Sequence, residues 1–265
     1  MQVLTILLAC GEKDTDIGLD DTDPVEVVDD TGEVEQATSF NVNGLAIDFM
    51  TREWAPAGLC VDIVDPTGTL VSGDSADLEI LGSAVVAEEG AFSVIGIETD
   101  SEVGLFVVLR DCADEALHMP TATGVEVGAY AEIEDGGTVA VQGLVFPLAM
   151  VDGAIDPSLS GLVEESVKVT GFMTGFVLAG GVPVDAAVVE GQDALVLYLD
   201  ADPTDGLFTT AGELNVGTAS AAGGAVMVPG APITTYTCTH ETETFGAQVF
   251  GAMPGLATVM AFDAE

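Results

Sequence analysis

Basic residues are nearly absent from this chain. Its 265 residues contain 45 Asp and Glu against four Lys and Arg, which gives a formal net charge of −41. Nucleic-acid binding needs a basic patch that releases counterions from the phosphates, so nucleic acid is excluded as a partner. The same negative field disfavours contact between the body of the protein and anionic lipid. Charge this one-sided also strains a compact state by self-repulsion, which added salt relieves.

Residues suited to catalysis are scarce as well. The two histidines are His118 and His240, and zinc sites usually need three or four His and Cys ligands at close spacing. We interpret Cys238-Thr239-His240-Glu241 as a loop that carries these residue types by chance. A serine triad would need an activated serine beside one histidine, and no Gly-x-Ser-x-Gly elbow is present. We therefore expect a non-enzymatic protein, with a hydrolase built on scattered carboxylates as an open alternative.

Aromatic side chains and long apolar runs are few. The chain has one Trp, three Tyr and eleven Phe, and no apolar run approaches the length of a membrane span. Sugar-binding sandwiches generally expose a flat aromatic platform. Trp54, beside Arg52 and before Pro56, is the candidate ligand platform. Packing in the core or plugging a strand edge is the alternative role for this side chain.

Four cysteines are present, at positions 10, 60, 112 and 238. Cys60 and Cys112 fall in the same expected domain, and we predict a disulfide between them, worth roughly 4 kcal/mol by the chain-entropy relation. The alternative is that both are small buried hydrophobic residues. Cys238 is then left over, as a buried free thiol or an intermolecular partner.

The chain opens with a short apolar run, Val3 to Ala9, that ends in Leu7-Leu8-Ala9-Cys10. This resembles the lipobox of bacterial lipoproteins, in which Cys10 becomes the lipidated first residue of the mature protein. Residues 1–9 have no Lys or Arg and are shorter than a usual signal core, so we interpret them as a truncated lipoprotein signal segment. The resemblance implies a location at the cell envelope, on the outer membrane or cell surface, with membrane contact through the lipid on Cys10.

An acidic segment follows. Residues 12–35 contain eleven Asp and Glu, one Lys and no aromatic residue. Such a stretch buries too little apolar surface to offset its ordering entropy, and its self-repulsion keeps it extended. We predict that residues 10–37 are a disordered tether. A calcium site on its aspartates is the alternative, but the glycine turn and closing carboxylate of a calcium loop are missing.

From Phe40 onward, short apolar stretches alternate with Gly, Pro, Asp and Thr, which is typical of an antiparallel β-sandwich. Asp65-Pro66-Thr67-Gly68 has the composition of a turn. The predicted strands of the first half are 40–48, 58–64, 84–87, 91–97 and 104–110.

Three fragments of the first half occur in a characteristic order: Gly44-Leu45-Ala46-Ile47, then Ala55-Pro56-Ala57-Gly58-Leu59-Cys60-Val61, then Gly90-Ala91-Phe92-Ser93-Val94 with Gly96. This order resembles the carboxypeptidase regulatory-like domain, also called transthyretin-like or prealbumin-like. It recurs as Gly175-Phe176-Val177-Leu178, Gly181-Val182-Pro183-Val184-Asp185-Ala186-Ala187-Val188 and Gly223-Gly224-Ala225-Val226-Met227-Val228. The resemblance implies two tandem non-catalytic β-sandwiches whose prolines and glycines shape the backbone.

Between the two copies, apolar residues recur near the helical period, and Pro147 is expected to kink or shorten the helix. Asp156 to Gly161 is expected to be an exit loop. The periodic residues are Val141, Leu144, Val145, Leu148, Val151 and Ile155.

One loop alternates acids before a glycine, as calcium loops do. Asp200, Asp202 and Asp205 precede Gly206 and are the candidate ligands for a structural calcium, although the glycine falls one residue late for an EF-hand. A solvated turn is the alternative.

Together these features predict an all-β protein of two small antiparallel sandwich domains joined by a partly helical connector and preceded by a disordered acidic stalk. The expected parts are the signal segment 1–9, the tether 10–37, sandwich 38–112, connector 113–167 and sandwich 168–265. The expected function is that of an exported, lipid-anchored, non-enzymatic scaffold or binding protein with an unknown protein or glycan partner. The alternative is a carbohydrate-binding or calcium-dependent adhesive module.

Overall fold

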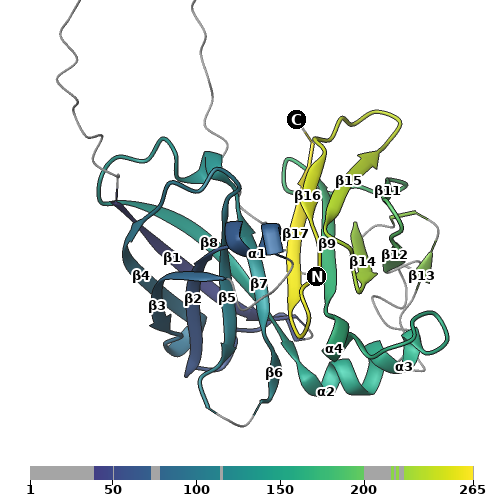
Figure 1. Cartoon of the computed structure of the whole chain (residues 1–265), viewed down its shortest axis with the longest axis horizontal. Helices are drawn as coiled ribbons and strands as arrows, with labels where there is room; N and C mark the ends of the chain where they lie inside the picture. Colours follow the sequence, from purple (N-terminus) through teal and green to yellow (C-terminus); the bar gives the residue numbers. More distant parts are fainter. Residues whose placement is uncertain are drawn as a thin grey trace, which may run out of the picture.

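The computed structural model describes residues 39–49, 51–72, 78–113, 116–199, 216–217, 219–220 and 224–264. Cys10, the acidic tether and the calcium candidates Asp200, Asp202 and Asp205 lie outside the described residues. In Figure 1 the purple to teal strands form one body, the green to yellow strands form a second, and β7 and β17 lie between them.

Strands account for most of the described structure. They are β1 (Ser39–Asp48), β2 (Leu59–Asp65), β3 (Glu79–Val85), β4 (Ala91–Glu98), β5 (Leu105–Asp111), β6 (His118–Met119), β7 (Thr121–Val125), β8 (Gly137–Pro147), β9 (Phe172–Ala179), β10 (Val182–Pro183), β11 (Val188–Gly191), β12 (Leu197–Leu199), β13 (Val216–Gly217), β14 (Ala225–Pro229), β15 (Thr234–Thr239), β16 (Gln248–Phe250) and β17 (Ala257–Asp263).

Helical segments are short. They are α1 (Thr67–Ser72), the 3-10 turns η2 (Glu88–Gly90) and η3 (Val127–Ala129), α2 (Leu148–Met150), the π-helical η4 (Val151–Ile155), α3 (Asp156–Leu159) and α4 (Val167–Thr170). None of the helices in the described part of the chain is long and apolar enough to cross a bilayer.

The strands form three open sheets, so the predicted all-β sandwich class is confirmed. One sheet has the order β4-β1-β8-β6, the second has the order β13-β12-β14-β9-β17-β7-β5-β2-β3 with β10 attached to β9, and the third has the order β11-β15-β16. Three pairs are parallel, namely β1 with β8, β9 with β17 and β7 with β17, which the sequence did not indicate. Parallel neighbours need a long crossover, and between β1 and β8 the crossover includes β2, β3, β5 and β7 of the ten-stranded sheet.

The two halves repeat one strand arrangement. In the first half, β1 is antiparallel to β4 and parallel to β8, while β2, β5 and β7 form an antiparallel run. In the second half, β9 is antiparallel to β14 and parallel to β17, while β11, β15 and β16 form the antiparallel run. The fragments that recur in the sequence therefore occupy corresponding strands, because β1 and β9 hold the first fragment of each copy and β4 and β14 the third.

The sandwiches share a sheet. Thr121–Thr123 of β7 pair in parallel with Ala257–Val259 of β17, which joins the two halves into one ten-stranded sheet. The four-stranded sheet packs on one half of it over Phe40, Val61, Ile97 and Val107, and the three-stranded sheet packs on the other half over Val189, Val226, Tyr236 and Phe262.

Residues 113–167, predicted as a partly helical connector, contain both strands and helix. Residues 118–147 supply β6, β7 and β8 to the first half, and the continuous helical stretch runs from Leu148 to Leu159. Val141, Leu144 and Val145 lie in β8, which is buried on both faces from Gly143 to Phe146 and therefore lacks the alternation that marks a half-buried strand. Pro147 does set the boundary, because the helix begins at the next residue. The expected exit loop at Asp156 is instead the helix α3.

The helical segment closes the space between the halves. Met150, Val151, Ile155 and Leu159 are buried against residues of β6, β8, β9 and β17 in one cluster. Two smaller differences concern the first half: Thr67 begins α1 where a turn is predicted, and the third strand spans Glu79–Val85 and not 84–87.

Candidate functional site

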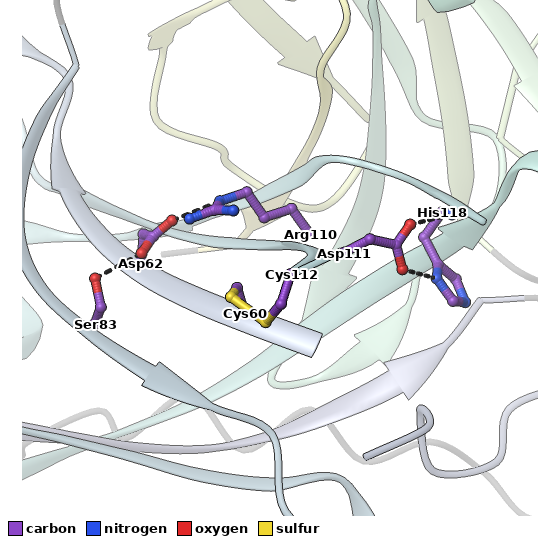
Figure 2. The surroundings of a disulfide bond; sticks show 7 residues. All are labelled: Cys60, Asp62, Ser83, Arg110, Asp111, Cys112 and His118. Carbon is purple, nitrogen blue, oxygen red and sulfur yellow. Dashed lines mark hydrogen bonds and ion pairs between the residues drawn. A yellow bond between two sulfur atoms is a disulfide. The ribbon is translucent and has the colours of Figure 1, made fainter. Parts of the chain in front are cut away.

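Five polar side chains of the first half lie near a disulfide (Figure 2). Cys60 of β2 and Cys112, directly after β5, are joined with a Cα–Cα distance of 5.0 Å, so the predicted pairing is confirmed. Cys60 lies opposite Arg110 in the β2–β5 ladder, which brings the two cysteines together. The bond closes a separation of 52 residues, for which the chain-entropy relation gives about 4 kcal/mol of stabilisation. Such bonds persist in exported, oxidising compartments.

Asp62 is the most deeply buried of the acids in Figure 2 and links three strands. Its side chain is 6% exposed, Arg110 Nε of β5 donates to Oδ2 at 2.8 Å, and Ser83 Oγ of β3 donates to Oδ1 at 2.6 Å. A buried carboxylate is tolerated because it is paired and hydrogen-bonded. Asp62, Arg110 and Ser83 therefore fasten β3, β2 and β5 together, and none of the three was singled out from the sequence.

Asp111 and His118 form a second pair beside the disulfide. His118 Nδ1 lies 2.8 Å from Asp111 Oδ1, and the amides of Leu117 and His118 donate to Oδ2 at 2.7 and 2.8 Å. Burial favours the neutral acid, but these hydrogen bonds outweigh it and hold the pKa of Asp111 below its ordinary value. The carboxylate thus anchors the start of β6 to the end of β5.

A hollow of about 240 Å³ opens next to this pair. An imidazole oriented by a carboxylate is half of a nucleophile-activating arrangement. The described lining residues of the hollow include no serine or threonine, and the one sulfur among them is committed to the disulfide, so they offer no hydroxyl or thiol nucleophile. It is lined by Pro56, Ala57, Gly58, Leu59, Asp111, Cys112, Ala113, Leu117 and His118.

His240 has a local role in a turn. Its Nδ1 accepts hydrogen bonds from the amides of Thr242 and Glu243, at 3.4 and 3.2 Å. His240 and Glu243 also stand at His-x-x-Glu spacing, a peptidase metal motif that was not recognised from the sequence. No group of three or more His, Cys, Asp and Glu that suits a metal ion occurs among the described residues.

Cys238 lies in the core of the second half. It is 7% exposed, beside Tyr236 and Phe250, and it is a free cysteine. Burial raises the pKa of its thiol to about 11 and that of the Tyr236 hydroxyl to about 12. Of the two readings of Cys238, the structure supports the buried thiol.

A second hollow, of about 450 Å³, lies over β11 in the second half. Tyr198 contributes to its wall, but the hydroxyl is already used, because it accepts from the Val189 amide at 2.9 Å and donates to the Val189 carbonyl at 3.0 Å. Glu190 is its one ionisable side chain apart from that tyrosine. No described arrangement of acid, base and nucleophile is present here.

Trp54 is exposed, as a ligand platform requires. Its relative exposure is 54%, and its backbone forms an isolated antiparallel β-bridge with Ile47 near the end of β1. The η2 turn packs beside it, since a Cβ on Gly90 would lie 3.4 Å from Trp54 Cβ. Arg52 turns away onto the ring of Phe49, 4.7 Å from its centroid. The structure therefore leaves Trp54 available and does not bring it to either hollow.

Comparison with known proteins identifies no family. No family model and no curated protein matches the chain. Solved structures aligned to it include the D295N mutant of the shaft pilin SpaA from Lactobacillus rhamnosus GG, at 10% identity over 86% of this chain and 98% of that one, with a TM-score of 0.28. The minor pilin GBS52 of Streptococcus agalactiae aligns at 9% identity over 86% and 97% of the two chains, with a TM-score of 0.21. These scores are too low to assign a family or a function.

Proposed function

We propose that this protein is an exported, non-enzymatic β-sandwich scaffold, held at the cell envelope by a lipid on Cys10, that displays its edges and loops to a protein or glycan partner. The observation that carries the proposal is the Cys60–Cys112 disulfide, which fits an oxidising compartment outside the cytoplasm. The lipobox-like Leu7-Leu8-Ala9-Cys10 would supply the lipid anchor. The acidic segment after it would hold the sandwiches away from the membrane surface.

The roles of the polar side chains support a scaffold. Asp62, Asp111 and Arg110 link strands, and His240 receives the amides of its own turn. Each of these groups has a structural partner, and neither hollow brings a base beside a nucleophile. The carboxypeptidase regulatory-like resemblance, in which such sandwiches are non-catalytic companions, agrees with this proposal.

The test of the anchor is the Cys10→Ser variant expressed in a bacterial host, with a full-length signal core placed ahead of Leu7 in both the wild-type and the variant chain. We expect the wild-type chain to incorporate labelled palmitate, to fractionate with membranes and to be processed in a globomycin-sensitive manner. The variant should lose the label and appear in the soluble fraction. Cys238→Ser is the matched control, because it removes a thiol without touching the lipobox. Equal membrane association of the wild-type chain and the Cys10 variant would refute the anchor.

A second candidate function is glycan binding at Trp54, favoured by the exposure of its indole. Flat aromatic rings stack on apolar sugar faces, so Trp54→Ala should abolish binding on a glycan array and Trp54→Phe should retain part of it. If the alanine variant binds the same glycans as the wild-type chain, Trp54 is not a ligand platform.

A further inference from the structure

Among the described strands, β3 has a hydrogen-bonded neighbour on one side only. It is the last strand of the ten-stranded sheet, with β2 on its inner side. The amide of Val86 donates inward to the Leu59 carbonyl. Because inward and outward groups alternate along an antiparallel ladder, the amides and carbonyls of Ser83 and Val85 point outward. Residues 83–85 therefore offer a free ladder to an added strand.

The side chains of β3 do not protect this edge. Ile80 is 58% exposed and Val85 is 57% exposed, and the strand has no Lys, Arg or Pro. Native edge strands are usually blocked by such residues, by bulges or by a covering segment. The pairing of β3 with β2 shifts register near Ile80. At Gly82, the face of β3 that is turned toward β4 packs on Val94 and Ile97. Apart from that register shift, residues 83–85 carry none of these blocking features.

Carboxylates flank the edge at both ends. Glu79 begins β3, and Glu88 and Glu89 follow it in the η2 turn, all three exposed. Arg110 of β5 is already paired with Asp62, so its charge is not available to these three carboxylates. The net charge of −41 also opposes pairing with a second copy of this chain. A partner segment with cationic ends and an apolar centre would therefore complement β3 and its flanking carboxylates.

We propose that β3 binds an extended segment of a partner protein, in which basic residues flank alternating apolar ones, as an added strand of the ten-stranded sheet. This rests on the display function proposed above and names its partner class. Main-chain hydrogen bonds supply the affinity in such pairing, and the flanking charges and apolar side chains supply selectivity. β3 has seven residues, about 23 Å at the usual rise, so a segment of eight or nine residues reaches the carboxylates at both ends.

The probe is the synthetic peptide Lys-Lys-Val-Thr-Val-Thr-Lys-Lys (the Lys-Val peptide), titrated into the full chain carrying Cys10→Ser. A peptide of the same charge with prolines at two central valines is the control, because it cannot complete the ladder. We expect the proline peptide to bind at least tenfold more weakly. The in vitro titration does not depend on export, so its failure leaves the anchor proposal standing.

Matched variants locate the site. Ile80→Lys and Val85→Lys should each weaken binding of the Lys-Val peptide at least tenfold. Ile95→Lys, the same change at a residue 77% exposed on β4, an edge strand of the four-stranded sheet, should leave its affinity within twofold. Circular dichroism melts verify that all three variants fold. Equal binding of the two peptides, an equal effect of the three substitutions, or no binding at all would overturn the proposal.

Discussion

At the scale of single residues, the buried polar groups act as ties between strands. Asp62 receives one hydrogen bond from each neighbouring strand, and Asp111 receives three from the segment that begins β6. Removing one partner from such a group leaves the others unpaired, which costs more than the bond itself contributes. Substitutions of these side chains are therefore expected to lower the free energy of unfolding most.

Asp111 is expected to make stability depend on acid pH. Its pKa is lowered in the folded state, so its contribution is present above the ordinary value and is lost as the pH falls through the folded value. Asp111→Asn should cost about 1.5–3 kcal/mol at pH 7, and the gap from the wild-type chain should shrink below pH 4. Urea unfolding between pH 7 and pH 2.5 measures it, with the exposed Asp100→Asn as control. A gap that stays constant across this range would contradict the role assigned to Asp111.

Cys238 is expected to be unreactive in the folded protein. A thiol with a pKa of about 11 and 7% exposure presents almost no accessible thiolate at pH 8. In the full chain carrying Cys10→Ser, a disulfide reagent that reports free thiols should label no cysteine in buffer and one in guanidinium chloride. Rapid labelling of the native protein would place Cys238 at the surface. No labelling after unfolding would mean that it is bonded to another chain.

At the scale of elements, close packing between strands depends on glycine at chosen points. A Cβ at Gly44 of β1 would run into the ring of Phe92 on β4, which is 5% exposed. Overpacking of this kind typically costs about 1–3 kcal/mol. We expect Gly44→Ala to lower the denaturation midpoint accordingly, and Gly128→Ala, whose added Cβ meets no atom within 4 Å, to change it little. Equal midpoints for the two variants would show that β1 and β4 do not pack as described.

Strands were predictable from the sequence where alternation or a continuous apolar run was clear. β1, β2, β4 and β5 begin within one residue of the predicted positions. β8 was missed because it is buried on both faces from Gly143 to Phe146, so its apolar residues do not alternate and their spacing also fits a helix. Its pairing with β1 shows that it is a strand. The Cys60–Cys112 pairing was predictable from the placement of both cysteines in one half. The cluster of Asp62, Arg110 and Ser83 was not, because it depends on the register of three strands.

At the scale of the whole molecule, the two sandwiches are held by a common sheet. The β7–β17 pairing and the helical cluster at residues 148–159 both cross between the halves. The predicted boundary at residue 112 separates β5 from β7 and β8, which complete the strand arrangement of the first half. We interpret the first repeat as residues 39–147, with 148–171 joining it to the second.

Salt is expected to stabilise the folded chain. The net charge of −41 repels itself most strongly in the compact state, and ions screen that repulsion over a Debye length that falls to about 3 Å at 1 M. The melting temperature should rise by several degrees between 10 mM and 500 mM sodium chloride. Sucrose, which leaves charges unscreened, is the control for general solvent effects. A melting temperature that does not change with sodium chloride concentration would contradict the role given to self-repulsion.

The central claim is that the protein is an exported scaffold that carries a lipid on Cys10 and a disulfide between Cys60 and Cys112 in its first sandwich. Peptide mass spectrometry of the chain recovered from a bacterial envelope, digested without reduction, tests both together. The account predicts a mature chain that begins at Cys10 with a diacylglyceryl mass, and a cross-linked peptide containing Cys60 and Cys112. A chain that keeps residues 1–9, with Cys10, Cys60 and Cys112 all free, would contradict it.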